Sequence, residues 1–258
     1  MSAALLTAHN LSVSYGERRV SFVPDLSVGP GECVAIVGES GSGKTSALLA
    51  LLGLQPGARV TGTVSMFGSP DVLSDRSRLT SFLGSRVALV SQSPISALNP
   101  TMRLGRFSEL VLRKHDRSKQ QAREQIAEAL SAVSLDHDIL RRYPHQVSGG
   151  QAQRFSIAIA LALGVELIVA DEPTSALDVT VQAEIVELLS AVRRDRGMGL
   201  LIVSHDIALV SGLADRIIVM KDGEVIEAGE THQMINNPAT DYARELIGAV
   251  PQLGGRTS

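Results

Sequence analysis

The sequence predicts an α/β fold in which a parallel β-sheet forms the core. Five apolar runs are continuous rather than alternating, as in strands that are buried on both faces of a parallel sheet. They lie at residues 33–38, 87–91, 167–170, 200–204 and 217–220. Helical patterns lie between several of these runs, and this alternation is typical of a doubly wound sheet with helices on its faces.

The helices between the strands are indicated by apolar periodicity. A helical pattern at 45–54 follows the first strand. The segments 118–133 and 181–192 each place their apolar residues on one face. Ser118 opens the first of these two segments and is the expected N-cap, because a serine hydroxyl can accept a hydrogen bond from the first helical turn.

Two regions depart from this alternation. Residues 1–35 and 60–68 show short alternating strand patterns with turns, which predict an antiparallel β subdomain near the N-terminus. Residues from about 93 to 160 contain helical patterns and no convincing strand, so we expect an inserted α-helical subdomain there. The later segment MKDGEVIE predicts a hairpin with Asp222 and Gly223 at its turn.

The composition is that of an ordinary globular protein. The 258 residues are 44% apolar and 20% charged, and the net charge of −3 argues against nucleic acid as a partner. Cys33 is the only cysteine in the sequence, so no disulfide forms within the chain, and we expect a buried strand residue in a reducing cytosol. We expect one domain over residues 1–250 and a short tail at 251–258.

No segment of the sequence is expected to cross a membrane. The longest apolar region, residues 157–170, is interrupted by Glu166 and is too short to span a bilayer. We therefore expect a chain that is soluble on its own, and a membrane role would need a separate membrane subunit.

The segment GESGSGKT predicts a phosphate-binding loop. It fits the pattern G-x-x-x-x-G-K-[ST], follows a predicted strand and opens a predicted helix. Backbone N–H groups of such a loop surround phosphate oxygens, Lys44 places a cation at the β and γ phosphates, and the Thr45 hydroxyl can bind Mg²⁺. The residues expected at the nucleotide are Gly38, Glu39, Ser40, Gly41, Ser42, Gly43, Lys44, Thr45 and Ser46. The alternative is a glycine-rich turn with a chance Lys-Thr pair.

The segment LIVADE predicts the acidic half of the same site. A buried strand ends in two carboxylates. Asp171 can hold the Mg²⁺ shell, and Glu172 can polarise the water that attacks the terminal phosphate. The alternative is that the two carboxylates only form an acidic N-terminus for the segment that follows.

The segment VSGGQ at residues 147–151 adds a third motif. With all three motifs in this order, the chain resembles ATP-binding cassette (ABC) ATPases, the nucleotide-binding subunits of ABC transporters, over about residues 5–250. The family signature is usually written LSGGQ, and Val147 is a conservative replacement. The resemblance implies a P-loop, RecA-like core and the cofactors ATP and Mg²⁺. It further implies that the signature contacts ATP held by a second ATPase subunit, identical or related. The residues concerned are Ser148, Gly149, Gly150 and Gln151. A local helix cap is the alternative.

Four further positions match motif positions of the family. Tyr15 resembles the aromatic residue that stacks on adenine, unless it is only a residue of a strand face. Gln92 resembles the glutamine that senses Mg²⁺ and links to the membrane partner, unless it merely ends a strand. Asp178 in SALD resembles a residue at the interface of two cassettes, although it could only cap a helix. His205 resembles the histidine that bonds the γ-phosphate, although a lone histidine is often structural.

The resemblance assigns two sets of roles. The expected catalytic residues are Lys44, Glu172 and His205. The expected Mg²⁺ ligands are Thr45, Gln92 and Asp171.

Longer segments resemble the ATPases of oligopeptide, dipeptide and nickel importers. They are SPISALNPTMRLG, YPHQVSGG and DEPTSALDVTVQAEI. Ser93 departs from this group, which usually has an acidic or amide residue there. Many members also carry a cysteine cluster near the C-terminus for an iron–sulfur cluster. Because this sequence has no cysteine there, we expect no iron–sulfur cluster.

The resulting functional prediction is an ATPase that energises an ABC importer of peptides, nickel or a similar small solute. The implied partners are two transmembrane permease subunits and, indirectly, an extracellular solute-binding protein. The implied location is the cytoplasmic face of the membrane, as a peripheral subunit. The main alternative is a soluble, non-transport ABC ATPase that acts on a macromolecular complex. A small-metabolite kinase and an exporter are weaker alternatives.

Overall fold

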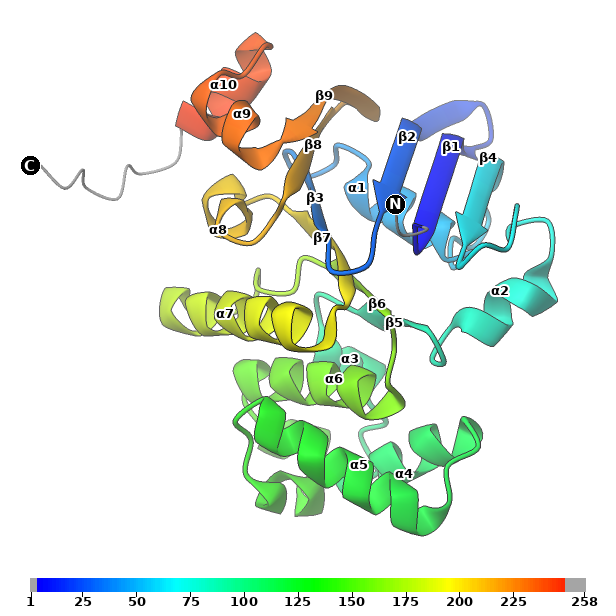
Figure 1. Ribbon diagram of the computed structural model, residues 1–258, viewed down its shortest axis with the longest axis vertical. Helices are drawn as coiled ribbons and strands as arrows, with labels where there is room; N and C mark the ends of the chain where they lie inside the picture. Colours follow the sequence, from blue (N-terminus) through cyan, green and yellow to red (C-terminus); the bar gives the residue numbers. More distant parts are fainter. Residues whose placement is uncertain (1–3, 249–258) are drawn as a thin grey trace, which may run out of the picture.

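A nine-stranded sheet runs through the computed structural model, which describes residues 4–248 (Figure 1). Its five core strands lie side by side in the order β8-β3-β7-β6-β5, and all neighbours pair in parallel. Their bounds are β3 (Cys33–Val37), β5 (Val87–Val90), β6 (Leu167–Asp171), β7 (Gly199–Ser204) and β8 (Arg216–Lys221). The five apolar runs are therefore confirmed as the parallel core.

The predicted antiparallel strands continue the same sheet. They are β1 (Leu6–Tyr15), β2 (Arg18–Val28), β4 (Arg59–Met66) and β9 (Glu224–Glu230). Strand β1 pairs antiparallel with both β2 and β4. A single parallel pair, Phe22 with Glu224, joins β2 to β9 and so links this part to the core. The predicted hairpin is present as β8 and β9, and both turn residues have positive φ, 49° at Asp222 and 84° at Gly223.

The insertion between β5 and β6 is helical, as predicted. It contains α3 (Pro94–Ala97), α4 (Leu104–Lys114), α5 (Lys119–Ala132), two short 3₁₀ helices (His137–Arg141 and Pro144–Gln146) and α6 (Gly149–Leu163). Ser118 caps α5, because its side chain accepts a hydrogen bond from the Gln121 N–H. Figure 1 shows α4 and α5 at the far end of the molecule from the N-terminal strands, with α6 lying between them and α7 (Val179–Arg196). A further helix, α2 (Arg76–Phe82), connects β4 to β5.

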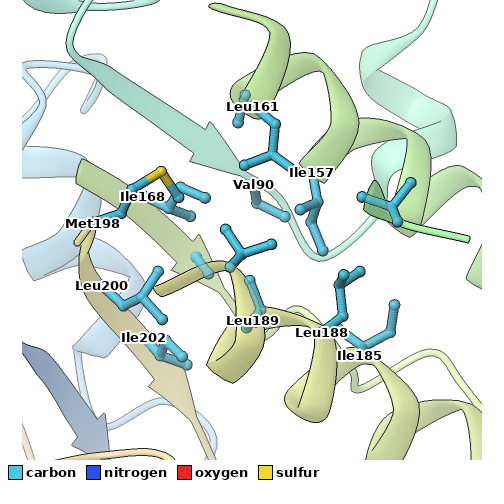
Figure 2. Packing of buried hydrophobic residues seen from close by; sticks show 14 of the residues in the cluster. Val90, Ile157, Leu161, Ile168, Ile185, Leu188, Leu189, Met198, Leu200 and Ile202 are labelled. Carbon is cyan, nitrogen blue, oxygen red and sulfur yellow. The ribbon is translucent and has the colours of Figure 1, made fainter. Parts of the chain in front are cut away.

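Apolar clusters cover both faces of the parallel strands. On β3, Cys33, Ala35 and Val37 join one cluster, whereas Val34 and Ile36 join the other. The first cluster includes α6 and α7, and Figure 2 shows side chains of these helices packed against strands β5, β6 and β7. The second includes α1 (Lys44–Leu51) and the N-terminal strands. The core is thus covered on both faces, as the apolar runs predicted.

Cys33 is a buried strand residue. Burial raises the pKa of its thiol to about 12, so the reactive thiolate does not form near neutral pH.

Helices α9 (Thr231–Asn236) and α10 (Asp241–Gly248) follow β9 and lie beside each other in Figure 1, whereas α8 (Ile207–Ser211) lies between β7 and β8 in the chain. The tail expected at 251–258 lies outside the described residues. Across residues 4–248, the helices are all too short or too polar to cross a membrane.

Candidate functional site

A cavity of about 640 Å³ lies between the predicted phosphate loop and the β1–β2 hairpin. Its walls come from parts of the chain that are far apart in sequence. The lining residues are Arg18, Arg19, Val20, Ser40, Gly41, Gly43, Lys44, Thr45, Ser46, Gln92, Glu172, Asp222 and Gly223. The structure therefore brings most of the predicted loop together with Gln92 and Glu172. Gly38, Glu39 and Ser42 of the same loop do not line the cavity.

The glycines of the loop serve two different needs. A β-carbon at Gly38 would lie 2.1 Å from the Met220 carbonyl oxygen, and one at Gly43 would lie 2.4 Å from the Val20 carbonyl oxygen. These two glycines are required because neighbouring backbone comes too close for a side chain. Gly41 is different: nothing lies within 4 Å of its β-carbon position, and it lines the cavity. Its backbone therefore faces open space, as a phosphate cradle requires.

Lys44 holds the loop in shape. Its Nζ donates hydrogen bonds to the carbonyl oxygens of Gly38 at 2.8 Å and Glu39 at 2.7 Å, and to Ser42 Oγ at 3.2 Å. The side chain is buried, and this burial lowers the pKa of Lys44, although the nearby carboxylates of Glu172 and Asp171 oppose the shift. The loop thus surrounds a cation that lines the cavity.

Two of the predicted metal ligands are in direct contact. Thr45 Oγ1 at the start of α1 donates to Asp171 Oδ1 at the end of β6, over 2.9 Å. Burial raises the pKa of Asp171, and the hydrogen bond from Thr45 opposes this. A hydroxyl beside a carboxylate supplies oxygen ligands, which Mg²⁺ prefers, and Mg²⁺ commonly uses few protein ligands besides phosphates and water. The residues present therefore fit this ion.

The Glu172 carboxylate is held by two of the predicted site residues. Gln92 Nε2 donates to Glu172 Oε2 at 3.3 Å, and His205 Nδ1 lies 3.3 Å from the same oxygen. Gln92 also donates to Ser175 Oγ at 3.0 Å. Glu172 has φ of 44°, a left-handed conformation that is rare for a residue with a side chain. Such local strain is often found at functional sites, where the surrounding contacts maintain it.

The signature motif lies elsewhere in the chain. Its four predicted residues start α6 and do not line the cavity. Ser148 and Gln151 form a capping box: the Gln151 N–H donates to Ser148 Oγ at 3.2 Å, and the Ser148 N–H donates to Gln151 Oε1 at 3.1 Å. The local cap considered as the alternative is therefore present. A contact with the nucleotide of a second subunit stays a prediction.

The signature glycines also have a role within the chain. A β-carbon at Gly149 would lie 3.1 Å from Leu177, and one at Gly150 would lie 2.7 Å from Val181 Cγ1. The beginning of α6 is thus packed closely against the SALD segment and the first turn of α7. Local sequence patterns do not reveal this reason for the glycines, because the neighbouring segment is more than 25 residues away.

Asp178 and Tyr15 occupy more peripheral positions. Asp178 caps α7, since its Oδ1 accepts a hydrogen bond from the Val181 N–H at 3.1 Å. Tyr15 is 41% exposed and does not line the cavity, and its hydroxyl is hydrogen bonded to Gln55. Its backbone, however, pairs with Arg18, which does line the cavity. Tyr15 therefore stands beside the cavity, and its contact with adenine stays a prediction.

Five residues of the cavity wall are not among those predicted from the sequence. They are Arg18, Arg19, Val20, Asp222 and Gly223. Arg19 forms an ion pair with Glu224. The adjacent arginines shortly after Tyr15 were an available signal, because two cations beside a phosphate loop favour an anionic ligand. The Asp222–Gly223 turn was predicted, but not its place at the cavity.

Comparison with known proteins identifies the family. The pattern of the ABC transporter family matches residues 23–175, and the chain belongs to this family. It is 41% identical to a peptide import ATP-binding protein of Brucella melitensis, over 98% of this chain and 79% of that one. It is 39% identical to the dipeptide transport ATP-binding protein DppD of Escherichia coli, over 96% and 79% of the two chains.

A solved structure supports the same assignment. The ATP-binding cassette MJ0796, a dimer bound to ADP and Pi after hydrolysis, matches with a TM-score of 0.77 and 31% identity, over 88% of this chain and 98% of that one. The protein is thus an ABC ATPase. The predicted fold, the ATPase activity and the role in energising an ABC importer are confirmed, and the non-transport alternative is not favoured.

Proposed function

We propose that this protein hydrolyses ATP at the cavity described above to drive the import of peptides, as one of two cassettes in a membrane complex. The observation that carries this proposal is that three groups meet at the phosphate loop. They are the buried Lys44, the hydrogen-bonded pair Thr45 and Asp171, and Glu172 with its two polar neighbours. The solute is proposed because relatives of 41% and 39% identity are named for peptide and dipeptide transport. Nickel is the less favoured solute.

In the proposed mechanism, Glu172 is the general base. Its carboxylate lines the cavity and is oriented by Gln92 and His205. It accepts a proton from the water that attacks the terminal phosphate. Lys44 directs its charge at the β and γ phosphates, where negative charge develops during the reaction. His205, 3.3 Å from the Glu172 carboxylate, would steady it, and its bond to the γ-phosphate is proposed from the family resemblance.

Mg²⁺ is the proposed metal cofactor. Thr45 and Asp171 would hold it, with Gln92 beside them, because all three supply oxygen atoms at the carboxyl ends of β5 and β6 or at the start of α1. When bound, the ion would neutralise charge on the phosphate oxygens.

The second cassette is proposed to complete the site. Ser148 to Gln151 would face the ATP of that subunit, with Asp178 at the interface. Val179, at the start of α7 beside the signature, is 80% exposed, and an exposed apolar side chain at this place suits a protein contact. The partner is either a second copy or a related chain.

The membrane partners are proposed to bind near Gln92. Ile95 on α3 follows Gln92 closely, is 39% exposed, and offers apolar area to a partner. Two permease subunits docked there would place the protein at the cytoplasmic face of the membrane. An extracellular solute-binding protein would then act indirectly, and nucleic acid has no part in this function.

The test is reconstitution with the membrane subunits that co-purify from native membranes. In liposomes containing the whole complex, peptide-loaded binding protein should stimulate ATP hydrolysis, and Glu172→Gln should abolish the stimulation. Stimulation by nickel and not by peptides would contradict the proposed solute. Hydrolysis that is indifferent to the membrane subunits would contradict coupling to transport.

A further inference from the structure

The C-terminal helix α10 reaches the phosphate loop. The N–H of Glu39, the second residue of the loop, donates a hydrogen bond to the hydroxyl of Tyr242 on α10 at 3.2 Å. Tyr242 is buried, and Lys221 Nζ lies 4.4 Å from the centre of its ring. We propose that Tyr242 is a positioning residue for the nucleotide site, because it fixes the loop through the Glu39 amide.

The Tyr242 hydroxyl contacts the loop outside the cavity wall. Glu39 does not line the cavity, whereas the loop residues from Ser40 to Ser46 mostly do. Tyr242 therefore holds the amide of a loop residue that is not part of the cavity wall. A second hydrogen bond comes from the β8–β9 turn, where the N–H of Gly223, a residue of the cavity wall, donates to the Ser42 carbonyl oxygen at 3.2 Å. Two segments that follow β7 in the chain therefore hydrogen bond to the loop, at Glu39 and at Ser42.

The position of α10 is itself fixed by strand β9. The Glu227 carboxylate accepts hydrogen bonds from the Ala239 N–H at 2.7 Å, from the Thr240 N–H at 2.9 Å and from Thr240 Oγ1 at 2.7 Å. Thr240 Oγ1 in turn accepts from the Ala243 N–H at 3.2 Å, in the first turn of α10. A continuous set of contacts therefore runs from β9 through Thr240 and Tyr242 to the phosphate loop.

The consequence concerns nucleotide affinity. A loop that is already ordered loses less freedom when it binds phosphates, so binding is tighter than to a loose loop. Removing the Tyr242 hydroxyl leaves the fold and the aromatic packing in place but frees the Glu39 amide. This inference rests on the proposed nucleotide site, since it assigns a function to a hydrogen bond that holds the loop of that site.

The first experiment compares Tyr242→Phe with the parent. We expect ADP and ATP to bind about fivefold more weakly by titration calorimetry, which is the usual effect of one lost hydrogen bond. The KM for ATP should rise while kcat stays close to the parent value. In hydrogen exchange, the Glu39 amide should lose protection, whereas the amides of β3 should keep theirs. A general loss of packing would instead lower protection in both places. Tyr143→Phe, which removes a hydroxyl in the helical insertion, is the matched control.

A second variant tests the route through α10. Thr240→Val removes the hydroxyl that connects Glu227 to the start of α10, and we expect a similar rise in KM. The double variant with Tyr242→Phe should raise the KM for ATP no more than the more affected single variant does, because both changes act on the same hydrogen bond to Glu39. Additive effects, or parent-like affinity and Glu39 protection in Tyr242→Phe, would overturn the proposal. Lys44→Ala distinguishes failure of this inference from failure of the proposed nucleotide site. If Lys44→Ala also binds ATP normally, the proposed nucleotide site itself is wrong.

Discussion

Glu172 combines a left-handed backbone with a carboxylate that two other site residues contact. Its φ is 44°, and both Gln92 Nε2 and His205 Nδ1 lie 3.3 Å from its Oε2. The backbone conformation turns the chain immediately after β6, so that Asp171 meets Thr45 while Glu172 faces the cavity. The two neighbouring carboxylates thereby make separate contacts, which suits the separate roles proposed for them.

Replacing Glu172 by glutamine should separate binding from turnover. The amide keeps the shape of the side chain but cannot act as a base. We expect ATP affinity to stay close to that of the parent, while turnover falls by about 100-fold or more, the usual contribution of a general base. Calorimetry and a phosphate-release assay measure the two quantities. Turnover near the parent rate would show that another group is the base.

Arg18 provides a second test at the same scale. It lines the cavity and its backbone pairs with Tyr15. We expect Arg18→Ala to weaken ATP binding about threefold to fivefold, since a charge pair near the surface contributes up to about 1 kcal/mol. The loss should shrink at high salt, because salt screens exposed charges. Arg76→Ala, an exposed arginine on α2, is the control, and an equal loss there would contradict a local effect.

The difference between Glu172 and Arg18 shows what the sequence could predict at this scale. Glu172 stands in a local pattern of a buried strand followed by two carboxylates, and such patterns can be read from consecutive residues. Arg18 reaches the cavity through long-range pairing of β2 with β9 at Phe22 and Glu224. Consecutive residues do not determine that pairing, so the adjacent arginines after Tyr15 indicate an anionic ligand at most, and not their place at this cavity.

At the scale of elements, the contact between α6 and α7 gives the signature glycines a structural role. A β-carbon at Gly150 would lie 2.7 Å from Val181 Cγ1, so the two helices fit together because Gly150 has no side chain. From the sequence, the resemblance predicted that this motif contacts ATP held by a second subunit. Local patterns could not indicate that α7 of the same chain packs against it.

Gly150→Ala should therefore destabilise the fold by about 1–2 kcal/mol, because overpacking outweighs the better helix propensity of alanine. In a Val181→Ala background the same change should stabilise by up to about 1 kcal/mol, since the obstacle is gone. Urea unfolding measures both. Gly212→Ala is the matched control, because nothing lies within 4 Å of its β-carbon position. The same sign in both backgrounds would contradict the close contact with Val181.

The connection between β9 and α10 predicts a pH dependence. Burial alone would raise the pKa of Glu227, but hydrogen bonds from Ala239 and Thr240 outweigh it and lower the pKa below the usual 4.5. A carboxylate with a depressed pKa stabilises the fold above its unfolded pKa, and this contribution is lost as the pH falls through the folded value.

Glu227→Gln should therefore reduce stability most at neutral pH. The difference in unfolding free energy from the parent should shrink as the pH falls below about 4.5, the ordinary pKa of glutamate. Urea unfolding at pH 7, 5 and 3.5 checks this. A difference that stays constant over this range would show that the ionised carboxylate does not hold α10.

At the scale of the whole molecule, the phosphate loop depends on contacts from the C-terminal part of the chain. Met220 approaches Gly38, the Gly223 N–H binds the Ser42 carbonyl, and Tyr242 binds the Glu39 amide. The sequence predicted the strands, the hairpin and the loop separately, because each has a local pattern. Their meeting depends on the order of strands in the sheet, which local patterns do not determine.

We propose that each ATP site combines the phosphate loop of one cassette with the signature of another. The most direct test is ATP hydrolysis by two copies of the chain fused in tandem. Lys44→Ala disables the loop of one copy, and Ser148→Arg places a bulky side chain at the signature of the other. A melting curve checks each fusion, and Ser148→Ala controls for the lost helix cap.

Two arrangements of these changes distinguish the models. With Lys44→Ala in one copy and Ser148→Arg in the other, one composite site stays intact, so we predict measurable hydrolysis. With both changes in one copy, each composite site carries one defect, so we predict none. If the signature acted on the loop of its own chain, the second arrangement would hydrolyse ATP through its unchanged copy and the first would be inactive. That reversed result would contradict an ATP site shared between two cassettes.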